Sequence, residues 1–302
     1  MTLRLIEPAH PTRQLRRAIE DPVRVARQAL DMAPPDVHAA RRALKRARAL
    51  VRLGRAMWEP SDRRELAHRL RDAGRHASGT RDVEARIEAV DRLRSQIEPR
   101  YAEALEVLHD RLTAASCGTA PARDSHDPIT AARTEVEQAE HLLERHPPRG
   151  HGRGVAIFAP GLTRIAEKGA TALEHVRLRP TDTDAHHELR KRAKDMRHVV
   201  EFLEPAWPAV LGVWASELHR LTDDLGEAND LTLLLDWIEV QPHPEDTSHT
   251  TALGRVLREV RAARWATALS LATRIWASPP EDFVRAVLAW AGLREPVPQV
   301  PQ

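Results

Sequence analysis

Apolar residues recur every three or four positions through nearly the whole chain of 302 residues, and proline or glycine separates the periodic segments. This spacing is typical of amphipathic α-helices, and no segment of useful length alternates as a half-buried strand does. Helices are predicted at 11–32, 35–58, 61–77, 81–97, 99–115, 129–146, 156–178, 184–204, 207–224, 228–240, 249–277 and 280–292. Asp36, Ser61 and Thr183 are the predicted N-caps. The pattern predicts an all-α protein.

The composition agrees with helices and hides an uneven distribution of charge. Charged residues make up 30% of the chain and aromatic residues only 4%, which favours helices over strands. The formal net charge is +2, but Lys45, Lys191 and Lys194 fall in two short basic segments. Acidic residues gather elsewhere, in segments such as EARIEAVD and TEVEQAEHLLE. The near-neutral average therefore conceals a concentrated basic site.

Hydropathy and cysteine content indicate the cellular compartment in which we expect the protein. No apolar run approaches the roughly 20 residues that a membrane-spanning helix needs. The N-terminal segment MTLRLIEPAHPTRQLRRAIE lacks the apolar region of a secretory signal. Cys117 is the only cysteine, so an intrachain disulfide is excluded. We expect a protein of the reducing cytoplasm without membrane contact.

The two basic segments are copies of one pattern. HAARRALKRARALVRLGRAMW (38–58) and HELRKRAKDMRHVVEFLEPAW (187–207) both begin with His and end with Trp. Basic residues coincide at four positions between them, namely Arg41 with Arg190, Arg42 with Lys191, Lys45 with Lys194 and Arg48 with Arg197. Farther on, SGTRDV (78–83) and LGEANDL (225–231) place Asp82 opposite Asp230. Two similar halves, 1–150 and 151–302, are the economical explanation.

The spacing of the basic residues indicates an anionic ligand. On a helix, offsets of 0, 3, 4, 7 and 11 lie on one stripe, and offset 10 lies at its flank. Like charges on such a stripe repel each other by a few tenths of a kcal/mol per pair, which a protein tolerates when a polyanion occupies the site. A single basic helix is more often a solvated face, but chance surface charge would not repeat the same offsets in both halves. Two such stripes facing each other would line a basic groove.

The two segments resemble the paired motifs of the CHAD family, the conserved histidine α-helical domain. That pattern is close to V-H-x-x-R-x-x-x-[KR]-R-x-R, followed by a G-x-x-R-D element. VHAARRALKRAR (37–48) and HHELRKRAKDMRHVVEF (186–202) match the first part, and SGTRDVEARI and LGEANDLTLLL match the second. The chain departs from the pattern at Asp195, where a basic residue is usual, at His198, which replaces a tyrosine, and at Asn229, which replaces an arginine. The resemblance covers almost the whole chain.

The resemblance implies one domain over 1–302, with two pseudo-symmetric four-helix-bundle-like halves around a central basic groove or channel. It further implies binding of inorganic polyphosphate and association with polyphosphate granules and polyphosphate-metabolising enzymes. We expect a stand-alone, non-catalytic member without a cofactor or a metal site. The expected binding residues are His38, Arg41, Arg42, Lys45, Arg48, His187, Arg190, Lys191, Lys194 and Arg197. Further candidates are Arg13, Arg17, Arg24, Arg164, Lys168 and His198. Trp58 and Trp207 are expected core anchors, and Asp82 and Asp230 are expected to cap a helix or orient an arginine.

Two other classes of protein stay open. A nucleic-acid-binding protein could use the same basic helices, although seven of the few aromatic residues are tryptophans in apolar patterns and offer little for base stacking. A metal-dependent phosphohydrolase is suggested by His109–Asp110 and His126–Asp127, but neither pair has partner ligands at helical spacing. HPPRGH (146–151) is interpreted as a linker.

Because the chain offers little for base stacking, we expect it to bind nucleic acid only as a non-specific polyanion.

Overall fold

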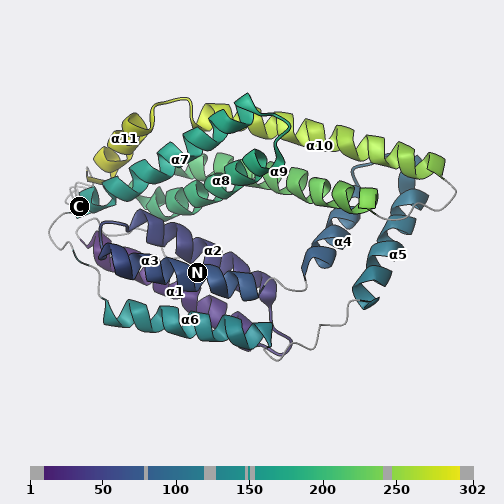
Figure 1. Cartoon of the computed structure of the whole chain (residues 1–302). Helices are drawn as coiled ribbons and strands as arrows, with labels where there is room; N and C mark the ends of the chain where they lie inside the picture. Colours follow the sequence, from purple (N-terminus) through teal and green to yellow (C-terminus); the bar gives the residue numbers. More distant parts are fainter. Residues whose placement is uncertain are drawn as a thin grey trace, which may run out of the picture. The chain divides into compact units, whose positions relative to one another are not determined.

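The computed structural model describes residues 10–77, 81–118, 127–146, 149, 154–240 and 247–292, and these residues form helices and connections without any strand. The predicted all-α class is confirmed. The α-helices are α1 (Pro11–Asp31), α2 (Val37–Leu53), α3 (Pro60–His76), α4 (Arg81–Leu93), α5 (Ala102–Gly118), α6 (Pro128–Arg145), α7 (Ala159–Leu178), α8 (Thr183–Leu203), α9 (Pro208–Val240), α10 (Thr247–Ile275) and α11 (Pro280–Gly292) (Figure 1). Short 3-10 helices cover Pro99–Tyr101, Gly154–Phe158 and Glu204–Ala206. Among the described helices, none is both long enough and apolar enough to cross a membrane.

Some helix ends differ from the prediction, because capping hydrogen bonds and proline, rather than the apolar periodicity, determine where the helix begins. Asp36 caps α2 as predicted, because its carboxylate accepts a hydrogen bond from the amide of Ala39 at 2.8 Å. The cap of α8 is Asp182 rather than Thr183, since the Asp182 carboxylate accepts from two amides of the first turn. Ser61 is also not a cap, because α3 already begins at Pro60, whose fixed φ suits the first helical position.

One helix, α9, replaces the two predicted at 207–224 and 228–240. The predicted break lies at Gly226, and a glycine inside a helix costs about 1 kcal/mol relative to alanine. Leu225 and Ala228 on either side are fully buried. Burial of these neighbours outweighs the local penalty, so the helix continues through the glycine.

The chain forms two compact units that do not coincide with the two sequence halves. The main unit comprises Met1–Ala77, Pro128–Arg220 and Thr273–Gln302, and the small unit comprises Ser78–Asp127 and Leu221–Ala272. Each sequence half contributes chain to both units. The expected division into halves at residue 150 describes sequence similarity rather than compactness, and it stays a prediction.

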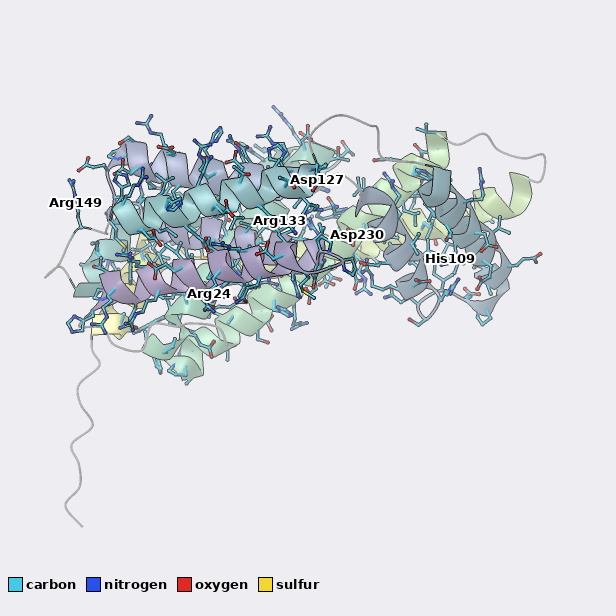
Figure 2. All side chains as sticks on the ribbon, turned by 90° about the horizontal axis from the view of Figure 1, so that it is seen from below. Arg24, His109, Asp127, Arg133, Arg149 and Asp230 are labelled. Carbon is cyan, nitrogen blue, oxygen red and sulfur yellow. The ribbon has the colours of Figure 1, made fainter. Side chains whose placement is uncertain are left out.

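Within the main unit, α1, α2, α3 and α6 close into a four-helix bundle. Helix α1 packs against α2 and α6, and α3 packs against the same two helices (Figure 1). Apolar residues such as Leu15, Ile19, Leu44 and Leu50 are fully buried between them. Arg133 of α6 donates a hydrogen bond to the carbonyl oxygen of Leu30 at 3.1 Å, which ties α6 to the last turn of α1 (Figure 2).

The remaining helices of the main unit pack around α7, which contacts α8, α11 and α2. Helix α2 also packs against α8, so the two helices that carry the duplicated motif are neighbours. The contact of α7 with α2 is backbone to backbone at Gly161. A Cβ placed there would lie 1.9 Å from the carbonyl oxygen of Leu53. Only glycine therefore fits where the start of α7 meets the end of α2.

The small unit has its own apolar core between α4, α5 and the parts of α9 and α10 assigned to it. Val90, Leu112, Leu234 and Leu257 are fully buried in this cluster. Asp230 accepts a hydrogen bond from Arg92 at 2.8 Å within the same unit. The backbone of Asp82 lies in α4, but its side chain is outside the described residues.

The close approach at Gly161 makes a prediction about stability. Gly161→Ala forces a methyl group onto the backbone of Leu53, and overpacking of this kind costs about 1–3 kcal/mol of unfolding free energy or more. The measurement is urea-induced unfolding followed by circular dichroism. Gly74→Ala is the matched control, because a Cβ there meets only Leu44 at 4.0 Å and alanine favours the helix. Equal stability of the two variants would contradict the close approach.

Candidate anion-binding site

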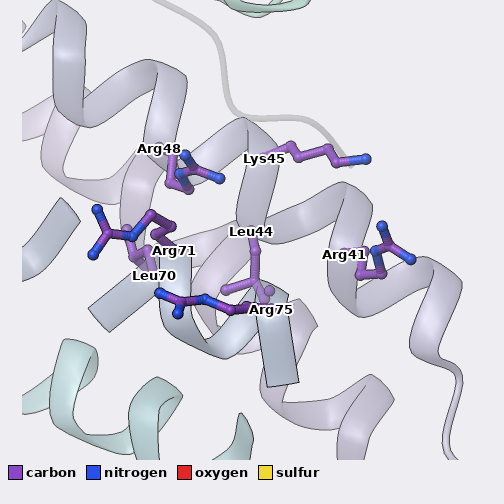
Figure 3. A pocket seen from close by; sticks show the side chains of 8 residues that line it. Arg41, Leu44, Lys45, Arg48, Leu70, Arg71 and Arg75 are labelled. Atoms are coloured by element: carbon purple, nitrogen blue, oxygen red, sulfur yellow. The ribbon is translucent and has the colours of Figure 1, made fainter. Parts of the chain in front are cut away.

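A pocket of about 270 Å³ lies between α2 and α3 in the main unit and is lined mainly by cations. Its charged lining residues are Arg41, Lys45 and Arg48 from α2 and Arg71 and Arg75 from α3 (Figure 3). Leu44 and Leu70, both fully buried, complete the wall together with Gly74. Cationic side chains from two helices thus surround two buried leucines.

The α2 residues that line the pocket differ from those that the helical spacing predicted for the basic stripe. Arg48, expected at the flank, lines the pocket, whereas Arg42 is exposed and not part of its lining. The cause is the orientation of α2, whose buried face of Ala40, Ala43 and Ala47 fixes which side remains outward. His38 lies exposed at the start of the same helix.

The two arginines of α3 were not predicted as binding residues, because they lie outside the duplicated motif. Asp72 fixes them. Its carboxylate accepts hydrogen bonds from Arg71 at 3.3 Å and from Arg75, and it lies 2.7 Å from Nδ1 of His68. Burial alone would raise the pKa of Asp72, but the hydrogen bond from Arg71 and the charges of Arg75 and His68 hold it below its usual value. The signal available in the sequence was the pair of arginines four positions apart on a helix, RDAGR.

Arg48 connects the pocket to a wider cluster of cations. Partial burial lowers the pKa of its guanidinium, and the nearby charges of Arg52, Arg71 and Arg192 lower it further against the effect of Asp195. Its Nε is buried without a hydrogen-bond partner in the described part of the chain. An anion at this position would satisfy the donor and reduce the repulsion.

Two ion pairs join α2 to α8 in a reciprocal arrangement. Arg46 of α2 lies 3.0 Å from Glu201 of α8, and Arg52 of α2 lies 2.9 Å from Asp195 of α8. In the alignment of the two motifs, Arg46 is opposite Asp195 and Arg52 is opposite Glu201. Each bridge therefore joins one motif position in α2 to the other motif position in α8. Contacts across a twofold axis have this pattern.

Carboxylates of the same helix neutralise part of the α8 stripe. Glu188 lies 2.5 Å from Lys191 and accepts a hydrogen bond from Arg192 at 2.6 Å. Burial opposes ionisation of Glu188, but these hydrogen bonds lower its pKa to about 2. Arg197 lies 3.4 Å from Glu201 and 3.2 Å from Nδ1 of His219. The two basic stripes were expected to be equivalent, but several cations of the α8 stripe are paired with carboxylates of α8. The pocket lies at α2 and α3.

The other predicted residues of the second motif occupy different surroundings. His187 is exposed on α8, and Arg190 and Lys194 are partly buried there. His198 is buried and lies 3.4 Å from Glu201. Burial lowers the pKa of His198, and the neighbouring Arg197 lowers it further, while Glu201 acts in the opposite direction. The imidazole is accordingly neutral near pH 7, which removes the charge that would attract a phosphate.

Lys168 and Arg164 of α7 lie near the same cluster. Burial lowers the pKa of Lys168, and the charges of Arg192, Arg164 and Arg52 lower it further. Helix α1 places its candidates differently. Arg13, Arg17 and Arg24 are exposed along it, and Arg24 pairs with Asp21 (Figure 2).

The two tryptophans that end the repeated segments are not equivalent. Trp58 is buried and donates a hydrogen bond from its indole to the carbonyl oxygen of His146 at 3.0 Å, as a core anchor would. Trp207 is 42% exposed, so its prediction as a core anchor is wrong. The chain leaves α8 through a 3-10 turn that carries Trp207 outward, where its ring packs edge to face on Trp290.

Metal ligands do not gather in the described residues, where no group of three or more His, Cys, Asp or Glu side chains is arranged to hold an ion. His109 is paired with Asp91 and Asp110 at 3.8 and 3.6 Å. His126 lies outside the described residues. The geometry of the main unit instead favours electrostatic binding of an extended anion by arginine and lysine.

The ionisation of Glu188 makes a prediction about pH. Because its folded-state pKa lies below the ordinary 4.5, the carboxylate stabilises the fold above pH 4.5, and this contribution is lost as pH falls towards about 2. Glu188→Gln should lower the unfolding free energy at pH 7 by at most about 1 kcal/mol, because the Lys191 pair is largely exposed. Chemical denaturation at several pH values should show the difference narrowing below pH 4.5. A difference that stays constant down to pH 2 would contradict this role of the carboxylate.

The reciprocal bridges make a second prediction. A double-mutant cycle of Arg46→Met and Glu201→Gln should give a coupling free energy of about 1–3 kcal/mol, because both groups are mostly buried. Arg258 and Glu239 provide the control, since they are separated by 2.9 Å but are 51% and 59% exposed. Their coupling should be about 0.5 kcal/mol or less. Equal couplings for the two pairs would show that burial of the bridge between α2 and α8 is unimportant.

Comparisons with known proteins agree with the motif. The family model of the CHAD domain matches residues 12–239. A crystal structure of the CHAD domain from the plant Ricinus communis is 17% identical, covers 95% of this chain and 92% of that chain, and has a TM-score of 0.48. The search of curated proteins found no match. Because the family model spans well over half of the sequence, the chain belongs to the CHAD family.

Proposed function

We propose that this chain binds inorganic polyphosphate, without catalysis, on the cationic surface of its main unit. The observation that carries the proposal is the pocket in which five cations from α2 and α3 meet. Membership of the CHAD family supports it, because this family is associated with polyphosphate. The proposed binding residues are those of the duplicated motif together with Arg71 and Arg75.

The chemistry of polyphosphate suits this surface. The polymer carries about one negative charge per internal phosphate and has no bases, so recognition depends on charge and on hydrogen-bond donors. Each charge-assisted hydrogen bond from arginine or lysine contributes roughly 1.5–3 kcal/mol. Arginine dominates the pocket and can bind two phosphate oxygens at once, whereas Lys45 adds a compact charge. A flexible polymer can adapt to cations that are fixed on two helices.

Carboxylates of the chain pair with some of the cations on this surface and hold their side chains in place. Asp72 and Asp195 hold arginines in place from positions that are mostly buried. In α8, Glu188 pairs with Lys191 and Arg192, and in α3, Asp72 pairs with Arg71 and Arg75. Binding at this surface would retain the protein at polyphosphate granules and near enzymes of polyphosphate metabolism.

The decisive variant reverses the charge of one lysine in each copy of the motif. Lys45→Glu with Lys194→Glu should abolish retention of long-chain polyphosphate at moderate salt and leave helicity intact, because Lys45 is exposed and Lys194 is only partly buried. Filter binding or calorimetry measures retention, and circular dichroism measures helicity. Unchanged binding by the double variant would rule out this site.

The control and the competitor make the test specific. Arg255→Glu with Arg274→Glu changes the net charge equally on exposed positions of α10 and should keep most of the binding. Affinity of the unmodified protein should fall steeply as salt rises, because phosphate contacts release counterions. Polyphosphate should displace a labelled oligonucleotide far better than the reverse. The opposite order would favour a nucleic-acid-binding protein.

A further inference from the structure

We infer that the pocket between α2 and α3 is a subsite for the terminal phosphate groups of a linear phosphate chain. This inference rests on the proposed function and adds to it a preference for chain ends. It concerns Arg71 and Arg75, which belong to no motif, as much as the motif residues Arg41, Lys45 and Arg48.

The shape of the pocket is the first reason. Its floor is made by Leu44 and Leu70, which are fully buried in the four-helix bundle. A phosphate chain that enters cannot continue through this floor, since apolar side chains offer no donor and the core leaves no passage. The volume of about 270 Å³ is also below the range of roughly 300–1,000 Å³ that drug-sized organic ligands occupy. A small pocket that Leu44 and Leu70 close on one side suits the end of a chain better than its middle.

The charge of the pocket is the second reason. A terminal phosphate carries about −1.5 to −2 near pH 7, because it has a second ionisable oxygen, whereas an internal phosphate carries about −1. Five cations line a volume of about 270 Å³, which holds only a short piece of chain. The piece with the highest charge per phosphate is the terminal one, so it compensates the repulsion between these cations best.

Preorganisation of the α3 arginines is the third reason. Asp72 engages Nε of Arg71 and one Nη of Arg75, which immobilises both guanidinium groups. Each guanidinium has five N–H donors, so these bonds leave donors available to a ligand. Arg48 contributes a buried Nε without a partner in the described part of the chain. A tetrahedral terminal phosphate presents three oxygens to such donors, one more than an internal phosphate, which shares two oxygens with its neighbours.

The test compares phosphates with and without ends. Labelled long-chain polyphosphate is bound to the protein and displaced by linear tripolyphosphate or by cyclic hexametaphosphate, which has more charges but no terminal group. We expect the linear compound to compete at a concentration about tenfold lower, the difference expected for one additional charge-assisted hydrogen bond. Arg71→Gln with Arg75→Gln should remove this preference, so that the linear and the cyclic compound compete at similar concentrations.

The controls separate this inference from the proposed function. Arg63→Gln with Arg64→Gln changes the same helix outside the pocket and should keep the preference. Arg75→Gln alone is a second variant that is expected to fold, because the Arg75 side chain is 69% exposed. The inference is wrong if the cyclic compound competes as well as the linear one, or if the preference survives in the α3 variants. Failure of long-chain polyphosphate to bind the unmodified protein would instead overturn the proposed function.

Discussion

The bridges of Arg46 with Glu201 and of Arg52 with Asp195 hold α2 against α8, and the cationic surface of the main unit depends on them. Both copies of the basic motif lie on these two helices, so packing them together brings like charges into proximity. Two carboxylates at the contact supply the compensating attraction. Because the bridges are mostly buried, loss of either carboxylate would leave an uncompensated charge, which is far more destabilising than loss of an exposed pair.

The distribution of carboxylates also explains why the two motif helices differ. Asp195 stands where a basic residue is usual in the family, and here it holds Arg52 and Arg192. Glu188 and Glu201 act similarly along α8, whereas the opposite face of the site is supported by Asp72 alone on α3. One copy of the motif therefore became mainly a scaffold of paired charges. The other copy lines the pocket together with Arg71 and Arg75 of α3.

Much of this could be predicted from the sequence, because it depends on local spacing. Helical periodicity, the cap at Asp36 and the duplicated basic positions are encoded within one or two turns. The continuity of α9 through Gly226 could not be predicted, since it depends on burial of its neighbours by distant segments. The participation of Arg71 and Arg75 was missed for the same reason: only the packing of α3 beside α2 makes them face Arg48. The exposure of Trp207 follows from a turn that the repeat does not share.

The proposed affinity for a polyanion would be a property of this fold rather than of the composition. With a formal net charge of +2, the unfolded chain carries its basic segments and its carboxylates without a fixed arrangement. Folding separates them, placing Asp72 and Asp195 behind the arginines and directing the cations outward. A ligand that binds only this arrangement stabilises it in proportion to the logarithm of its concentration. Repulsion between the cations of α2 and α3 would then favour the proposed binding of an anionic chain by the native state.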